Sequence, residues 1–137
     1  EAHGYAPLRG YAQPIFSGRR FIPVDSEFER AVLRALLQLR RVLDRQEIDL
    51  MLEKPVFDTL TEIGPCRPDF LLEARSRSTG EIRQIVIEAM GATDDAYLAA
   101  KAVTHPRMAQ IAPLLCISPK DASEDRIGPM VSRAFGL

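Results

Sequence analysis

Two carboxylates, Asp69 and Glu88, are the residues of this chain whose types and spacing suggest chemistry. Each belongs to a run of strand-forming residues, Asp69–Arg75 and Ile82–Ala89, and the Ser/Thr/Gly-rich segment Ser76–Gly80 between the runs predicts a β-hairpin. A turn centred in that segment makes Asp69 face Glu88, with Cβ atoms roughly 5 Å apart on one face of the hairpin. A register shift of one residue would instead turn Glu88 to the other face.

Two carboxylates at that separation repel each other unless a cation lies between them or one of them is protonated. A hard divalent cation resolves the conflict, because Mg²⁺ takes one or two carboxylates together with water and phosphate oxygens. The alternative is an ordinary ion pair in which Arg67 or Arg83 neutralises one carboxylate. Both interpretations stay open at this point.

Composition indicates a single domain of 137 residues and 15.3 kDa, with 46% hydrophobic residues and a net charge of −1. This balance excludes a globally basic nucleic-acid-binding protein, so any such surface must be a local patch. Cys66 and Cys116 lack metal-ligand spacing and are expected to be reduced and buried. Reduced cysteines predict a cytoplasmic protein. No apolar run approaches the roughly 20 residues that cross a bilayer. The chain begins with Glu1 rather than Met, which predicts a segment of a longer protein with other domains.

Residues 1–24 are expected to form an extended arm in front of a domain at residues 25–137, since closely spaced prolines exclude a regular helix. Aromatic residues alternate with basic ones in this arm, including Arg19 and Arg20. Such a strip either binds nucleic acid or packs over the core.

A helix is predicted from Asp25–Ser26 to about Arg45, because apolar residues recur there every three or four positions. The expected buried stripe comprises Phe28, Val32, Leu33, Leu36, Leu37, Leu39 and Leu43. Glu29 falls inside this stripe. It completes a capping box with Ser26, belongs to a functional site, or does both.

The remaining pattern predicts further strands and helices around the hairpin. The nearly continuous apolar centre of 82–89 indicates a strand covered on both faces, hence helices on both sides of a sheet. The predicted elements are a strand at Val56–Leu60, a helix from Asp94 to about Thr104 ended or kinked by Pro106, a parallel strand at Pro113–Ser118 and a closing helix at Ser123–Phe135.

The predicted second helix has two different faces. A small-residue face is expected to pack closely on the sheet, and a second face carries Tyr97, Lys101 and His105 at intervals of four. The small-residue face comprises Ala96, Ala99, Ala100 and Val103. On this interpretation Lys101 points away from the sheet. His105 then serves as a helix-end residue or takes part in catalysis.

The order of these elements, with Glu29 on a helix, Pro68-Asp69 opening a strand and Glu88 near the end of the next, resembles the PD-(D/E)XK phosphodiesterase superfamily. The resemblance covers Ser26 to Ser118 and implies a restriction-endonuclease-like α/β fold with a mixed sheet and an αβββαβ core, followed here by an extra C-terminal helix. It also implies that Glu29, Asp69 and Glu88, with the carbonyl of Ala89, bind Mg²⁺ or Mn²⁺.

The chain departs from the E-x-K element of that superfamily, because it reads Glu88-Ala89-Met90. In some members the catalytic lysine lies on the following helix, and Lys101 is the candidate for that role; otherwise Lys101 is a solvated helix residue. The alternative is a site that has lost catalysis and keeps the fold for binding.

The resemblance implies a metal-dependent nuclease that hydrolyses DNA phosphodiester bonds. An inactive module that binds nucleic acid or protein within a larger chain is the alternative, and a scaffold domain is a third. DNA and a second copy in a homodimer are the expected partners. The expected nucleic-acid contacts are Arg19, Arg20, Arg75, Arg77, Arg83 and Tyr97.

Overall fold

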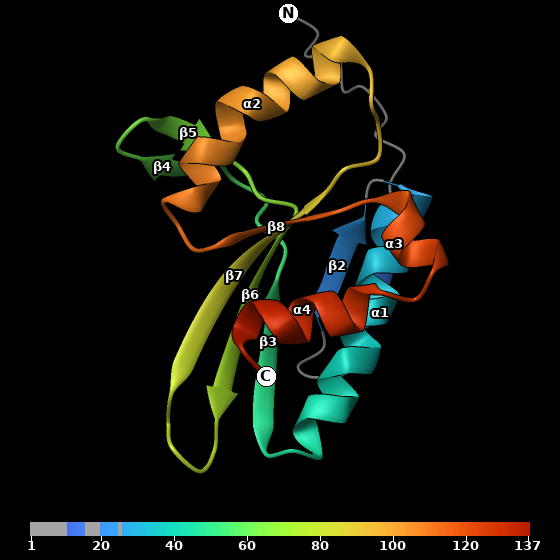
Figure 1. The fold of residues 1–137 in the computed structure, drawn as a ribbon, viewed down its shortest axis with the longest axis vertical. Coiled ribbons are helices and arrows are strands. Elements are labelled where there is room, and N and C mark those ends of the chain that lie inside the picture. The colour runs from blue at the N-terminus through green and yellow to red at the C-terminus, as the bar shows by residue number, and fades with distance from the viewer. Residues whose placement is uncertain (1–10, 16–19, 25) are drawn as a thin grey trace, which may run out of the picture.

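A four-stranded mixed sheet forms the centre of the molecule (Figure 1). The computed structural model describes residues 11–15, 20–24 and 26–137. In spatial order the strands are β3 (Ile48–Glu53), β6 (Phe70–Ser76), β7 (Ile82–Ala89) and β8 (Leu114–Ile117). Two of the pairings, β3 with β6 and β6 with β7, are antiparallel, and β8 runs parallel to β7. The predicted α/β class with a mixed sheet is confirmed.

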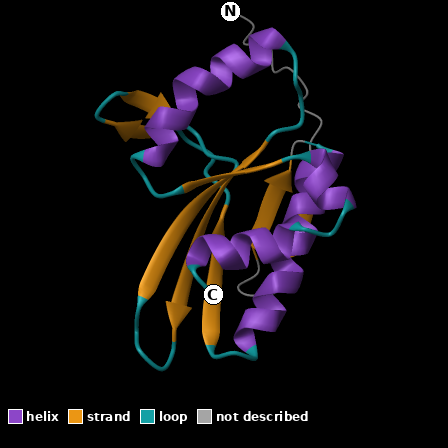
Figure 2. Cartoon of the chain, viewed as in Figure 1, coloured by secondary structure: helices purple, strands orange, loops and turns teal. Residues whose placement is uncertain are grey.

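Two helices cover one face of the sheet, α1 (Glu27–Asp44) and α4 (Ile127–Phe135) (Figure 2). The predicted stripe of α1 faces this core, with Phe28 and Leu37 at its partly buried margin. Each large apolar side chain buried here contributes about 1.5–3 kcal/mol. The core comprises Val32, Leu33, Leu36, Leu39 and Leu43 of α1, Leu50, Phe70, Leu72, Ile85 and Ile87 of the sheet, and Ile127, Val131 and Phe135 of α4.

The opposite face of the sheet is covered near the C-terminal end of β7 by α2 (Asp95–Ala109) and β5 (Gly64–Cys66). A small apolar cluster joins these elements and comprises Cys66, Val86, Met108 and Ala112. Residues 85–89 of β7 are buried, whereas residues 82–84 are exposed. The predicted burial of this strand on both faces therefore holds for its C-terminal part.

The predicted strand Val56–Leu60 is wrong except at its end, where Thr59 and Leu60 belong to a short strand outside the central sheet. The third strand of the hairpin sheet is β3, in which Ile48, Leu50 and Leu52 alternate with polar or exposed residues. Val56 and Phe57 instead lie in the connection to a short hairpin of β4 (Thr59–Thr61) and β5. Both runs are short and apolar, and the pairing with β6 decides which one forms the strand.

The predicted end of the second helix is also wrong, because α2 continues through Pro106 to Ala109. Proline removes one backbone hydrogen bond from a helix. Tertiary contacts hold the last turn in place: Met108 is buried, and Arg107 Nη1 donates to the carbonyl of Pro65 at 2.9 Å.

The C-terminal segment forms two helices rather than the single predicted one. α3 (Pro119–Ser123) begins with a capping box between Ser118 and Asp121. Asp125, at a φ of 54°, lies between α3 and α4 and changes the chain direction. Of the two cysteines, Cys66 is buried as expected, whereas Cys116 is exposed.

The predicted N-terminal arm contains two paired strands, β1 (Tyr11–Ile15) and β2 (Arg20–Val24), which run antiparallel. Its other residues, and Arg19 among them, lie outside the described part of the chain. None of the described helices is long and apolar enough to cross a membrane.

Candidate active site

Asp69 and Glu88 lie side by side at the end of the β6–β7 hairpin that is farthest from its turn. The register pairs Phe70 with Ile87, as the sequence predicted. The amide of Asp69 donates to Glu88 Oε1 at 3.0 Å, and the amide of Ala89 donates to Asp69 Oδ2 at 2.8 Å. Each carboxylate is thus held by the backbone of the opposite strand.

Burial makes it unfavourable for both carboxylates of this pair to be ionised. Glu88 is completely buried, and the side chain of Asp69 is 20% exposed. Burial raises the pKa of Asp69 above its ordinary value, and the nearby charge of Glu88 raises it further. The amide of Ala89 and two lysines oppose this shift in the pKa of Asp69 without cancelling it.

Lys101 is one of these lysines, and its ammonium group donates to Glu88 Oε2. Burial lowers the pKa of Lys101, but the hydrogen bond and the charge of Glu88 outweigh burial, so the pKa lies above its ordinary value. Lys101 is therefore a stable cation and a hydrogen-bond donor at neutral pH.

The orientation of α2 brings Lys101 to this position and corrects the predicted faces of the helix. The face that points toward the sheet carries Tyr97, Lys101, His105 and Met108, all at least partly buried. The small-residue face is the exposed one, and its members are Ala96, Ala99, Ala100 and Val103. Long polar side chains reach the carboxylates from a helix that stands over the end of the sheet, whereas alanines could not.

Tyr97 and His105 flank Lys101 on the same face. The Tyr97 hydroxyl donates to the carbonyl of Ala89 at 3.2 Å, and the Lys101 ammonium lies 5.3 Å from the centre of the Tyr97 ring. His105 Nε2 is 3.8 Å from Glu88 Oε2 and has no hydrogen-bond partner among the described residues. Burial, followed by the charge of Lys101, lowers the pKa of His105.

Lys54 is the second lysine of the site, and the sequence reasoning missed it. Its ammonium donates to Glu29 Oε2 at 3.0 Å, lies 3.9 Å from Asp69 Oδ1 and stands 5.0 Å from the centre of the Phe70 ring. Lys54 directly follows β3, and the end of β3 lies beside the start of β6. Correct assignment of β3 would have placed Lys54 next to Asp69.

Glu29 reaches the site from the first turn of α1, with 8% of its surface exposed. Ser26 caps the helix by accepting a hydrogen bond from the amide of Glu29 at 3.1 Å, and the carboxylate of Glu29 pairs with Lys54. The first turn thus serves both the helix start and the charge cluster.

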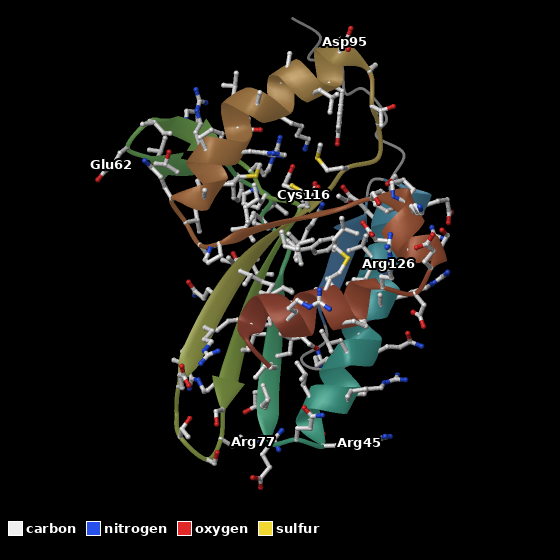
Figure 3. All side chains as sticks on the ribbon, in the orientation of Figure 1. Arg45, Glu62, Arg77, Asp95, Cys116 and Arg126 are labelled. Atoms are coloured by element: carbon white, nitrogen blue, oxygen red, sulfur yellow. The ribbon has the colours of Figure 1, made fainter. Side chains whose placement is uncertain are left out.

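Three of the arginines that were predicted to contact nucleic acid lie away from the carboxylate site. Arg75, Arg77 and Arg83 lie toward the turn end of the hairpin, where each is within salt-bridge distance of an acidic side chain. Figure 3 shows Arg77 at the lower end of the molecule, far from Cys116, which pairs with Glu88 across β7 and β8. The side chain of Arg20 lies outside the described part of the chain.

The donor set of the site suits a hard cation in part. Asp69, Glu88 and the carbonyl of Ala89 supply oxygen atoms only, which matches the ligand preference of Mg²⁺. Three carboxylates stand against two lysines, so the cluster of Glu29, Asp69, Glu88, Lys54 and Lys101 carries a negative charge when all five are ionised. Over the described residues, no three Asp, Glu, His or Cys side chains are arranged to hold one metal ion.

Comparison with known proteins identifies relatives of the chain. Residues 25–134 match the family described as restriction endonuclease-like C-terminal domain. An Escherichia coli protein described as "Uncharacterized protein in cib 5'region" is 37% identical over 134 residues, which cover 93% of this chain and 61% of that protein. The chain thus spans about three-fifths of the length of this relative. No solved structure matches the chain.

Proposed function

The chain belongs to the restriction endonuclease-like C-terminal domain family, and from this premise we propose that it is a metal-dependent nuclease that hydrolyses DNA phosphodiester bonds. The observation that carries the proposal is the contact between two carboxylates, Asp69 and Glu88, at the end of the central hairpin. Lysines approach this pair from both sides. Carboxylates that can hold a metal ion and lysines that can stabilise phosphate charge are groups that promote phosphodiester hydrolysis.

Asp69, Glu88 and the carbonyl of Ala89 would hold Mg²⁺ or Mn²⁺, with Glu29 serving a second ion or a water molecule in the outer shell. When bound, the metal lowers the pKa of water and stabilises negative charge on the scissile phosphate. The hydroxyl of Tyr97 fixes the carbonyl of Ala89 by its hydrogen bond of 3.2 Å. Lys54 holds Glu29 and lies close to Asp69, which keeps both carboxylates in place.

Lys101 is the proposed catalytic lysine, in place of the lysine that Met90 replaces in the E-x-K element. Because the pKa of Lys101 lies above its ordinary value, the ammonium group acts as a donor rather than as a base. It orients the attacking water or stabilises charge on a phosphate oxygen. The ammonium group has three N–H donors, of which one is bonded to Glu88, so another would reach the water or the phosphate.

An inactive nucleic-acid-binding module is the second candidate. It is favoured by the charge compensation within the site, since Glu88 is completely buried and bonded to Lys101. Such a module would bind DNA equally well with and without a divalent ion, and it would not cleave it.

The test is incubation of the purified protein with supercoiled plasmid and Mg²⁺, Mn²⁺ or EDTA. We expect cleavage only with the metal. Asp69→Asn should lower the cleavage rate by more than about 100-fold, because a direct metal ligand should contribute more than the roughly 10–100-fold that is typical of an outer-shell partner. Asp49→Asn is the matched control, since Asp49 is an acidic residue at the far end of the sheet. Cleavage in EDTA, or in Asp69→Asn at the wild-type rate, would contradict the proposal.

A further inference from the structure

The arginines of the described chain differ in whether the protein itself neutralises them. Those near the hairpin turn have acidic partners, as described above. Five others form no hydrogen bond or ion pair through their side chains within the described residues; three of them lie on α1, and a fourth directly follows its last residue. The five are Arg34, Arg40, Arg41, Arg45 and Arg133.

Three of these arginines form a row along α1. Arg34, Arg41 and Arg45 are separated by seven and four residues, so they fall within about 40° of the helix circumference and extend about 16 Å along its axis. All three are exposed. They lie on the side of α1 opposite the buried leucines, and we call them the α1 arginine row.

The positive charge of this region exceeds what helix stability explains. Residues 30–45 contain five arginines and one acidic residue, Asp44, in a chain whose net charge is −1. Asp44 is bound by Arg77, so it does not neutralise the row. Cations stabilise a helix by about 0.3–1 kcal/mol when they lie in its last turn, a reason that does not extend to Arg34 in the first half of α1.

The surface beside the row is hollowed. Arg41 and Arg45 line a hollow of about 570 Å³ between α1 and α4, whose other wall includes Gly128 and Pro129 and whose acidic lining residue is Asp125. Arg41 also lines a second hollow of about 430 Å³ beside β3. Figure 3 shows Arg45 projecting from the end of α1. The guanidinium groups are therefore accessible to an anionic partner.

We propose that the α1 arginine row binds the sugar-phosphate backbone of a nucleic acid, as a surface separate from the carboxylate site. Guanidinium groups bind phosphate oxygens in a bidentate manner. A row about 16 Å long covers roughly five base-pair steps of a duplex along its axis, at about 3.4 Å each. Glu29 lies on the buried face of the same helix, whereas the row lies on the exposed face. The row therefore contacts a different part of the nucleic acid from the part that is bound at the carboxylate site. The choice of a nucleic acid over an acidic protein rests on the proposed function.

Binding of labelled duplex DNA in EDTA, followed by fluorescence anisotropy at several salt concentrations, tests the row apart from cleavage. The variant is Arg34→Gln/Arg41→Gln/Arg45→Gln. The matched control, Lys120→Gln/Arg126→Gln/Arg133→Gln, removes the same charge from other exposed positions. We expect the row variant to bind at least about tenfold more weakly and to lose about one unit of log–log salt slope per arginine.

Several outcomes would overturn the inference: no DNA binding by the wild type, unchanged binding in the row variant, or an equal loss in the control. Polyglutamate serves as a second probe, and loss of polyglutamate binding with DNA binding retained would assign the row to an acidic protein segment instead. Thermal unfolding checks that both variants fold. Wild-type DNA binding without cleavage contradicts the proposed function alone, and cleavage with unchanged binding in the row variant contradicts this inference alone.

Discussion

The two ends of the β6–β7 hairpin both carry clustered charges, buried at one end and exposed at the other. At the open end Glu88 is completely buried, and the side chain of Lys54 is 9% exposed. At the turn end Arg77 bridges Asp44 and Asp49, whose side chains are 65% and 50% exposed. Water screens the second group, whereas the first depends on its partners for compensation.

The comparison separates stability from function. A buried ion pair is often no more stable than apolar side chains of the same volume, because removing charges from water is costly. The exposed network lowers the pKa of Asp49 through its hydrogen bond with Arg77, whereas the pKa of Asp69 in the buried cluster is raised. An ionised Asp69 is therefore unfavourable for folding, which is typical of a residue kept for chemistry.

The largest expected effect is that of breaking the buried pair. Lys101→Met leaves the carboxylate of Glu88 buried without its cation, which should lower the free energy of unfolding by about 3 kcal/mol or more. Thermal and urea unfolding measure this loss. The double variant Lys101→Met/Glu88→Met should recover most of it, since it removes the uncompensated carboxylate of Glu88 together with its cation. An unchanged melting temperature in Lys101→Met would show that the pair is not buried in solution.

An intermediate effect of opposite sign is expected at Asp69. Its raised pKa means that folding disfavours the ionised form, so the neutral Asp69→Asn should raise the melting temperature by a few degrees at pH 7. The gain should shrink as the pH falls through the pKa of folded Asp69, because the wild-type carboxyl is then protonated too. Thermal unfolding of both proteins between pH 8 and pH 4 gives the comparison. A destabilised Asp69→Asn would mean that the attraction of Lys54 and Lys101 outweighs burial.

The smallest effect is expected at the turn end. Arg77→Ala removes the ion pairs with Asp44 and Asp49 and should lower the free energy of unfolding by less than about 1 kcal/mol. The difference from wild type should decrease further with added salt. Urea unfolding at low and high salt measures both. If Arg77→Ala lowered the free energy of unfolding as much as Lys101→Met does, the exposed and the buried charge clusters would not differ in their effect on stability.

Local pattern was enough to predict the hairpin and the pairing of its two carboxylates. The turn residues and the two strands adjoin in the chain, so the register depends on few residues, and the observed pairing of Phe70 with Ile87 matches it. The same holds for the buried stripe of α1 and its cap at Ser26. Local pattern does not reveal the strand Ile48–Glu53, because its pairing partner β6 lies about twenty residues later and gives no local signal.

By itself the sequence determined the periodicities, the caps and the opposed carboxylates, since each follows from residues a few positions apart. Only the tertiary structure decided which face of α2 turns toward the sheet. Helical spacing grouped Lys101 and His105 correctly, but small residues alone could not reveal that the alanine face is exposed. Only the tertiary structure brought Lys54 to Asp69 and Glu29, because that contact joins an unrecognised strand end to a helix 25 residues away. Charges can meet in a buried site only after packing excludes water around them.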